Sequence, residues 1–198
     1  MGVVSEVSTA ELLDEIYFSG GTTTERGQRF ERLVRRFLEI DPTQAARFER
    51  VIPWSEWEDR TGQDVGIDLV GFEHDGGIVA VQCKFYDPDS TLSKADIDSF
   101  LAASGKHPFT GRMVVSTTDK WGANARLMLE DQQIPITTLG IADLLKASID
   151  WSKFDSATPE VLELKEGKQL RPHQVQALEN VTAGFKSHDR GQMIMACG

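Results

Sequence analysis

Apolar positions at helical spacing mark the first predicted elements of the chain. A stripe of such positions predicts a helix from about 25 to 39, and Glu31 lies immediately beside the stripe. The stripe consists of Phe30, Leu33, Val34 and Phe37. Before it, the capping-box pattern Ser8-Thr-Ala-Glu11 predicts a short lead-in helix over 8–19.

Two stretches rich in β-branched and aromatic residues predict a β-hairpin. The first runs from Val65 to Phe72 and the second from Ile78 to Tyr86, while residues 73–77 between them carry turn chemistry. A five-residue turn of this kind pairs Phe72 with Ile78. The pairing fixes which residues face one another farther along the hairpin.

In that register polar side chains converge at the centre of the hairpin. Asp68 falls opposite Gln82, and Gly66 falls opposite Lys84. Directly opposed residues have Cβ atoms about 4.5 to 5.5 Å apart, which is close enough for Asp68 and Gln82 to share one cation. Because side chains alternate along a strand, Gln82 and Lys84 point to one face and Cys83 points to the other.

A carboxylate, an amide and an ammonium inside an apolar hairpin are costly unless they have partners. Such groups either satisfy one another structurally or hold a ligand. Three structural alternatives stay open at this point. Asp68 could satisfy a neighbouring turn, Lys84 could pair with it, and Gln82 could face solvent on an edge strand.

The remainder of the first 150 residues alternates helical and extended patterns. Helices are predicted over 93–105, 121–130 and 141–147, and strands over 51–54, 111–117 and 134–138. Strands that alternate with helices after an initial hairpin imply a mixed central sheet flanked by helices on both faces. The predicted fold class is therefore α/β.

The formal net charge of -10 at pH 7 argues against tight non-specific DNA binding by this chain alone. Five arginines nevertheless crowd the helix predicted over 25–39: Arg26, Arg29, Arg32, Arg35 and Arg36. A solvated face and a phosphate-contacting face are equally compatible with this pattern.

The spacing of the cysteines and the hydropathy of the chain indicate the cellular compartment in which the protein would work. Cys83 and Cys197 lie far apart without CxxC spacing, so neither a disulfide framework nor a zinc site is indicated. We find no basic leader and no apolar run long enough to cross a membrane. We therefore expect a cytoplasmic protein that makes no membrane contact.

The composition changes after residue 150. The predicted organisation is a first domain over 1–150, a polar linker over 151–169 and the start of a second domain over 170–198. In the last part, Pro172 opens a helical pattern that continues to Phe185. Residues 191–198 follow as a buried-strand pattern.

Three motifs, in order and on the predicted elements, resemble the Mrr-like branch of the PD-(D/E)XK nuclease superfamily. They are Gly27-Gln-Arg-Phe-Glu31, Gly66-Ile-Asp68 and Gln82-Cys-Lys84. In that branch the second acidic residue is often Gln, as it is at position 82. The resemblance covers roughly residues 20 to 148 and implies a restriction-endonuclease-like fold that hydrolyses DNA phosphodiester bonds.

The resemblance also implies a role for each site residue. Asp68 would be the main carboxylate ligand of Mg²⁺, with Mn²⁺ as a substitute, and Gln82 would add its amide oxygen. The carbonyl of Cys83 and the side chain of Glu31 would complete the ligands, Glu31 directly or through water. Lys84 would orient the attacking water or stabilise charge on the phosphate. Asp64, two residues before Gly66, is a weaker candidate and fits a loop or strand-entry residue better, and His74 in the predicted turn is too far from the centre of the hairpin for general-base work.

The segment Arg171-Pro-His-Gln174 with the following strand pattern resembles the opening of a superfamily 2 helicase motor. A nuclease before such a motor is similar to the N-terminal part of a Type ISP restriction-modification enzyme. The resemblance implies double-stranded DNA as substrate and ATP for the motor alone. It also implies downstream helicase, methyltransferase and target-recognition domains, and a second copy where both strands are cut.

Two other functions remain open from the sequence. One is a nuclease-fold module that lacks catalysis and serves in docking or regulation, which the acidic charge and Gln82 favour. The other is a junction or repair nuclease, which shares the chemistry and differs in substrate.

Overall fold

The computed structural model describes residues 11, 14–15, 20–60, 66–87, 89–167 and 171–190. Most of the predicted lead-in helix and the strand predicted over 191–198 lie outside these residues, although Glu11, Asp14 and Glu15 are helical. The chain forms two compact units, Met1–Lys165 and Glu166–Gly198. Among the described residues, no helix is long and apolar enough to cross a bilayer.

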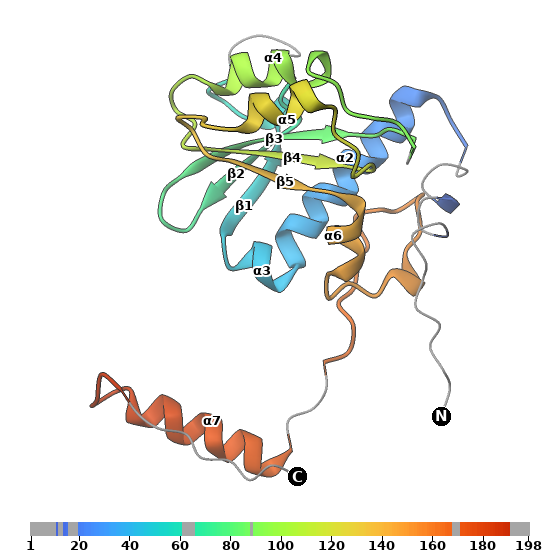
Figure 1. Cartoon of the computed structure of the whole chain (residues 1–198). Helices are drawn as coiled ribbons and strands as arrows, with labels where there is room; N and C mark the ends of the chain where they lie inside the picture. The colour runs from blue at the N-terminus through green and yellow to red at the C-terminus, as the bar shows by residue number, and fades with distance from the viewer. Residues whose placement is uncertain are drawn as a thin grey trace. The chain divides into compact units, whose positions relative to one another are not determined.

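A five-stranded mixed sheet forms the centre of the first unit, in the order β1-β2-β3-β4-β5 (Figure 1). The strands are β1 (Phe48–Pro53), β2 (Leu69–Glu73), β3 (Ile78–Lys84), β4 (Gly111–Ser116) and β5 (Ile136–Leu139). The first three strands pair antiparallel, whereas β3, β4 and β5 pair parallel. The prediction of a mixed sheet in an α/β fold is therefore confirmed, and β3 is its central strand.

Helix α2 (Thr23–Ile40) covers one face of the sheet. Its capping box is complete: Thr22 Oγ1 accepts from the Glu25 N–H at 3.2 Å, and Glu25 Oε2 accepts from the Thr22 N–H at 2.6 Å. The predicted apolar stripe is buried on this helix and packs on β3 side chains, including Val79 and Val81. We call this layer the α2-side core.

Two further helices follow α2 on the chain, one before and one after the sheet strands, and the later of the two, together with the segment after it, joins the α2-side core. The short helix α3 (Pro42–Ala45), which the sequence analysis missed, is capped by Asp41. Helix α6 (Ile141–Lys146) adds Ile141 and Leu144 to the core. Trp151, at the start of the 3-10 helix Trp151–Lys153, donates its indole N–H to Leu144 O at 3.1 Å.

Part of the predicted linker packs on the first unit. Leu162 is buried in the α2-side core, and Leu164 forms an isolated bridge with Ile149. Residues 151–165 thus bury apolar groups together with the sheet domain.

Helices α4 (Ala95–Ser104) and α5 (Ala123–Leu129) cover the opposite face of the sheet (Figure 1). Their side chains meet Val70, Ala80 and Val114 of the strands, together with Trp54 of the 3-10 helix Trp54–Glu56. We call this layer the α4-side core. The two cores place a helix on each side of β3, where the candidate chemistry lies.

The second unit contains one described helix, α7 (Pro172–Gly184), which confirms the helical pattern opened by Pro172. Val175, Leu178 and Phe185 have more than a third of their surface exposed. This unit therefore leaves apolar side chains uncovered within its described residues.

Candidate active site

The strand β3 carries two of the predicted site residues. Val81 and Cys83 contact the α2-side core and Ala80 lies in the α4-side core, so alternation directs Gln82 and Lys84 toward α4. This arrangement confirms that Gln82 and Lys84 share a face that excludes Cys83. In the parallel ladder with β4, Gln82 lies beside Val114 and Lys84 beside Ser116.

Gln82 is only 3% exposed, and its Oε1 atom has no hydrogen-bond partner. Buried polar atoms are nearly always paired, because an unpaired one costs about 1–3 kcal/mol. The position of Gln82 on a central strand also excludes the alternative of an edge residue facing solvent. The unpartnered amide oxygen of Gln82 is therefore available to coordinate a cation.

The predicted hairpin register is confirmed from Phe72–Ile78 to Leu69–Val81, where the ladder ends. Asp68 lies just beyond this end, and its main-chain N–H donates to Val81 O at 2.9 Å. Its Oδ2 atom accepts a 2.6 Å hydrogen bond from the main-chain N–H of Cys83. A side-chain carboxylate thus continues the bonding between the two chain segments where main-chain pairing stops.

The predicted pairing of Gly66 with Lys84 is wrong, because Gly66 lies outside the ladder. Gly66 has φ +78, and a Cβ atom there would come within 2.9 Å of Ser99 Oγ and 3.2 Å of the Phe100 nitrogen. The same atom would lie 3.4 Å from Gln82 Nε2. Gly66 therefore allows the chain to turn tightly under α4 just before Asp68.

Three of the predicted site residues, Asp68, Glu31 and Lys84, act electrostatically on the thiol of Cys83. Burial raises the pKa of this thiol well above its usual range, and the negative charges of Asp68 and Glu31 raise it further. The positive charge of Lys84 acts in the opposite direction. Charges influence a thiol in this way only at short range. Helix α2, which carries Glu31, packs on the face of β3 to which Cys83 belongs, and this packing agrees with the influence of Glu31 on that thiol.

Two residues that sequence reasoning did not assign to the site lie on the α4 side. Tyr86 Oη donates to Asp96 Oδ1 at 2.6 Å, and the charge of Lys84 acts on the Asp96 carboxyl. Residues 93–96 had been interpreted only as a helix start. The available signal was the position of Tyr86, two residues after Lys84 and therefore on the same face of an extended chain.

The donor set fits a hard divalent cation. Oxygen ligands are the ones that Mg²⁺ and Mn²⁺ prefer. Here the donors are the Asp68 and Glu31 carboxylates, the unpartnered Gln82 Oε1 and the main-chain carbonyl of Cys83. In the described part of the chain, no cluster of three His, Cys, Asp or Glu side chains has metal-binding geometry. The candidate donor set accordingly combines two carboxylates with an amide oxygen and a main-chain oxygen.

Most of the arginine side chains on α2 form ion pairs with acidic side chains. Arg35 and Arg36 contact Glu39 at 3.1 and 3.6 Å, and Arg32 contacts Glu160 at 3.6 Å. Arg29 donates to the carbonyl of Gly20 at 2.8 Å. Of the two interpretations open from the sequence, the structure favours a solvated, ion-paired face over a basic surface for phosphate.

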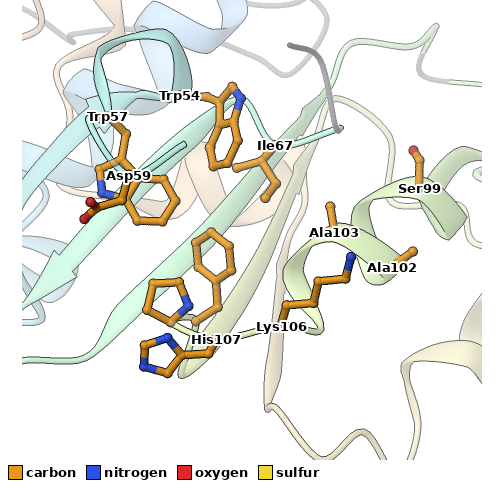
Figure 2. A pocket seen from close by; sticks show the side chains of 11 residues that line it. Trp54, Trp57, Asp59, Ile67, Ser99, Ala102, Ala103, Lys106 and His107 are labelled. Atoms are coloured by element: carbon orange, nitrogen blue, oxygen red, sulfur yellow. The ribbon is translucent and has the colours of Figure 1, made fainter. Parts of the chain in front are cut away.

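A groove of about 440 Å³ adjoins the site on the α4 side. Figure 2 shows the indole rings of Trp54 and Trp57 on one side of it and α4 residues on the other. Two residues of the groove lining connect it to the site. Ile67 lies between Gly66 and Asp68 in the sequence, and Ser99 of α4 lies against Gly66. Both tryptophans are more than nine-tenths buried, which supports core packing as their main role.

A protein-family model described as a restriction endonuclease matches residues 39–161. This range includes Asp68, Gln82 and Lys84, whereas Glu31 precedes it. No curated protein matches the chain.

Two solved structures of restriction enzymes resemble the chain. LlaBIII, described as an ATP-dependent Type ISP restriction-modification enzyme bound to DNA, is 36% identical with a TM-score of 0.73. That alignment covers 96% of this chain and 12% of LlaBIII. The MspJI restriction endonuclease in complex with a 27-mer oligonucleotide is 21% identical with a TM-score of 0.47, over 73% of this chain and 32% of MspJI. The family model spans more than half of the sequence and contains the hairpin site, so the chain belongs to this family of restriction endonucleases.

Proposed function

We propose that the chain is a Mg²⁺-dependent endodeoxyribonuclease module that hydrolyses phosphodiester bonds of double-stranded DNA. The observation that carries this proposal is the buried, unpartnered Oε1 of Gln82 beside the fixed carboxylate of Asp68. Their shared neighbour, Lys84, supplies a positive charge on the same face as Gln82.

Asp68, Gln82, Glu31 and the carbonyl of Cys83 would hold the cation. When bound, Mg²⁺ would polarise a phosphoryl oxygen and lower the pKa of an attacking water. The Cys83 N–H fixes the orientation of the Asp68 carboxylate, so this ligand need not be ordered when DNA arrives. Because Gln82 carries no charge, we expect weak metal binding until a DNA phosphate joins the site.

Lys84 would orient the attacking water or offset the charge that develops on the phosphate. An ammonium group suits this role because it acts as a compact point charge with three donors. None of the helices described in the structure was identified from the sequence as a recognition helix rich in base-reading side chains, so target choice would come from elsewhere in a longer protein.

The likeness to LlaBIII supports a wider proposal about the parent protein. We propose that this module precedes a superfamily 2 motor that consumes ATP and translocates on DNA, followed by methyltransferase and target-recognition domains. Helix α7 with its uncovered apolar residues suits the first helix of such a motor. Site-specific cleavage would belong to the parent, and two copies would meet where both strands are cut.

The test is nicking of supercoiled plasmid by the 198-residue chain in Mg²⁺, in Mn²⁺ and in EDTA. Nicking should require metal and should be lost in Asp68→Ala and Lys84→Ala. Asp98→Ala and Lys94→Ala are matched controls, since these two residues form an exposed pair at 3.7 Å on the first turn of α4. Cleavage in EDTA, or equal cleavage by all variants, would contradict the assignment.

A second measurement does not depend on activity. Mn²⁺ binding, followed by water-proton relaxation with uncleavable phosphorothioate DNA present, should weaken at least about tenfold in Asp68→Ala. Unchanged binding in that variant would refute the ligand assignment. If the unsubstituted 198-residue chain binds no Mn²⁺ at all, a docking module without catalysis would be favoured instead.

A further inference from the structure

The groove of about 440 Å³ on the α4 side borders the candidate active site directly. Ser99 Oγ, which belongs to the groove lining, lies 2.9 Å from the point that a Cβ atom of Gly66 would occupy. Gln82 Nε2 lies 3.4 Å from the same point. Ile67, another residue of the lining, is followed directly by Asp68. A substrate held at Gln82 and Asp68 would therefore have this end of the groove as its neighbour.

One wall of the groove is a fixed aromatic surface, formed by Trp54, Trp57 and Phe109 (Figure 2). The ring centroid of Trp57 lies 5.2 Å from that of Trp54 and 5.4 Å from that of Phe109. All three side chains are more than nine-tenths buried in the α4-side core. A flat ligand that packs against this wall would not have to order the rings first, so it would bind at little entropic cost.

The opposite wall is one face of α4 and of the turn that follows it (Figure 2). Ser99, Ala102, Ala103 and Lys106 line the groove, and their spacing is that of a single helix face. The first three side chains are small, which keeps the groove open along the helix. At 1.5 Å per residue the face extends roughly 10 Å from Ser99 to Lys106. The groove thus runs from the active site to a lysine.

The charge of the groove differs from that of the chain as a whole. The chain has a net charge of -10, whereas Lys106 and His107 are exposed at the groove with one carboxylate, Asp59, in the lining. None of the ion pairs among the described residues involves Lys106. An ammonium group without a carboxylate partner, beside an otherwise mostly apolar cavity, suits a ligand with a flat apolar part and a negative charge.

A nucleotide has both parts, a flat base and an anionic phosphate. The volume of the groove lies within the range of about 300 to 1,000 Å³ that is usual for small-ligand sites. A base that stays stacked in a duplex cannot lay its face against a protein wall, so it would enter the groove only after it leaves the stack. The contact would tolerate any sequence, because every base has such a face.

We propose that this groove binds one unstacked base of the cut DNA strand beside the cleavage point. The base lies against the aromatic wall, and a flanking phosphate contacts Lys106. The inference rests on the proposed nuclease function and adds a substrate feature to it, since the strand reaches the groove from the site of Asp68 and Gln82. Single-stranded DNA therefore binds the chain more tightly than duplex DNA does.

The test is tryptophan fluorescence of the 198-residue chain, titrated in EDTA with a single-stranded oligonucleotide of eight thymidines. EDTA prevents metal-dependent cleavage, and two of the four tryptophans of the chain line the groove, so stacking of a base there should quench the emission. A duplex of eight base pairs should bind more weakly and quench less.

Ala102→Leu fills the groove from an exposed position of α4. It should abolish the quenching and weaken oligonucleotide binding roughly tenfold or more, since a few carbon atoms in a binding pocket have effects of this size. Ala123→Leu is the matched control, because it makes the same change at an exposed position of α5 outside the groove lining. This variant should bind as the parent does, and the melting temperatures of both should match that of the parent.

Lys106→Ala tests the charge without filling the groove. Loss of one phosphate contact should weaken binding and lower the slope of log affinity against log salt concentration by about 0.7, the value for one contact to a single strand. Lys94→Ala removes an exposed lysine from the opposite end of α4 and should leave the slope unchanged.

The outcomes separate this inference from the nuclease proposal. Equal binding by the parent and Ala102→Leu, or tighter binding of the duplex than of the single strand, would overturn the role of the groove whatever the nicking results. An octaglutamate peptide that quenches as strongly as the oligonucleotide would also overturn it and would point to a polypeptide occupant. Quenching that depends on the groove, in a chain that nicks no plasmid with any metal, would support base binding and reject the nuclease assignment.

Discussion

The Oδ2 atom of Asp68 accepts a 2.6 Å hydrogen bond from the main-chain N–H of Cys83. If Asp68 also binds the metal as proposed, its structural role and its metal-binding role are separable, because the hydrogen bond needs only an acceptor oxygen whereas the metal needs the negative charge. Asp68→Asn retains an acceptor for the Cys83 N–H. Asp68→Ala leaves that N–H unpaired in a partly buried place.

We therefore expect the Asp68→Ala and Asp68→Asn variants to have different free energies of unfolding but the same loss of nicking activity. Asp68→Ala should lower the free energy of unfolding by about 1–3 kcal/mol, the cost of one unsatisfied buried donor. Asp68→Asn should stay within about 0.5 kcal/mol of the parent. Both should abolish nicking. Urea denaturation beside a plasmid assay checks the pair, and equal destabilisation by both would show that the charge matters to the fold.

Gly66→Ala should be among the more damaging single-methyl changes in the chain. The residue combines φ +78 with a steric obstacle, since the added Cβ would lie 2.9 Å from Ser99 Oγ. The expected loss of stability is about 1–3 kcal/mol, with a parallel loss of nicking because Asp68 follows two residues later.

Gly76→Ala is the control for Gly66→Ala. Gly76 has φ +90 but nothing within 4 Å of an added Cβ, so it carries the backbone strain alone. The difference between the two variants in melting temperature measures the clash with α4. Equal shifts would mean that α4 yields to the extra methyl group.

Gln82→Leu should abolish nicking without lowering the stability of the fold. Leucine has a similar volume and removes an amide oxygen that is buried without a partner. Stability should stay equal or rise by up to about 1 kcal/mol, while metal-dependent nicking should be lost. A marked fall in melting temperature would instead indicate that the amide serves the fold.

Ionisation of Tyr86 reports directly on the Asp96 contact. Burial, then the hydrogen bond to Asp96 and its negative charge, raise the pKa of Tyr86 to about 12. The chain has only two tyrosines, Tyr17 and Tyr86, so absorbance at alkaline pH can be assigned by Tyr86→Phe. Asp96→Asn should move the Tyr86 transition toward lower pH, and Asp98→Asn should not. If Asp96→Asn leaves the midpoint of the Tyr86 ionisation unchanged, the hydrogen bond between Tyr86 and Asp96 does not form in solution.

The Asp96 carboxyl should also contribute to acid sensitivity. Its pKa is lower in the folded protein than in the unfolded chain, so its contribution is present at neutral pH and is lost as pH falls through the folded value. The stability gap between the parent and Asp96→Asn should therefore shrink below about pH 4. Chemical denaturation at pH 7 and at pH 3 measures this difference in unfolding free energy at each pH. A difference that grows in acid would contradict a lowered pKa of Asp96 in the folded protein.

Local patterns predicted most of the sheet domain, and long-range contacts account for what they missed. The hairpin register followed from turn length and alternation, both of which are local. The irregular path through Gly66 could not be predicted, since it depends on Ser99 and Phe100 of a helix that packs there only in the folded state. Strand β1 begins at Phe48, three residues before the predicted start, because an irregularity between Phe48 and Arg50 interrupts the apolar alternation.

The site residues show the same division. Gln82 and Lys84 were placed correctly by period-two alternation, whereas Asp96 was predicted only as part of the helix start at 93–96, because its partner Tyr86 lies ten residues away. The pairing of Arg32 with Glu160 was equally invisible, since it joins α2 to the segment after the sheet. The metal-ligand and catalytic roles of Glu31, Asp68, Gln82, Cys83 and Lys84 stay predictions.

The ion-paired arginines of α2 bear on when such an enzyme would cut. A carboxylate beside each of Arg32, Arg35 and Arg36 reduces the long-range attraction that speeds encounters with DNA. Cleavage would then depend on local concentration, which a tether to a DNA-bound partner raises to the millimolar range. Under the proposed function, the module would spare DNA that it meets by free diffusion and would cut DNA that a tethered motor brings to it.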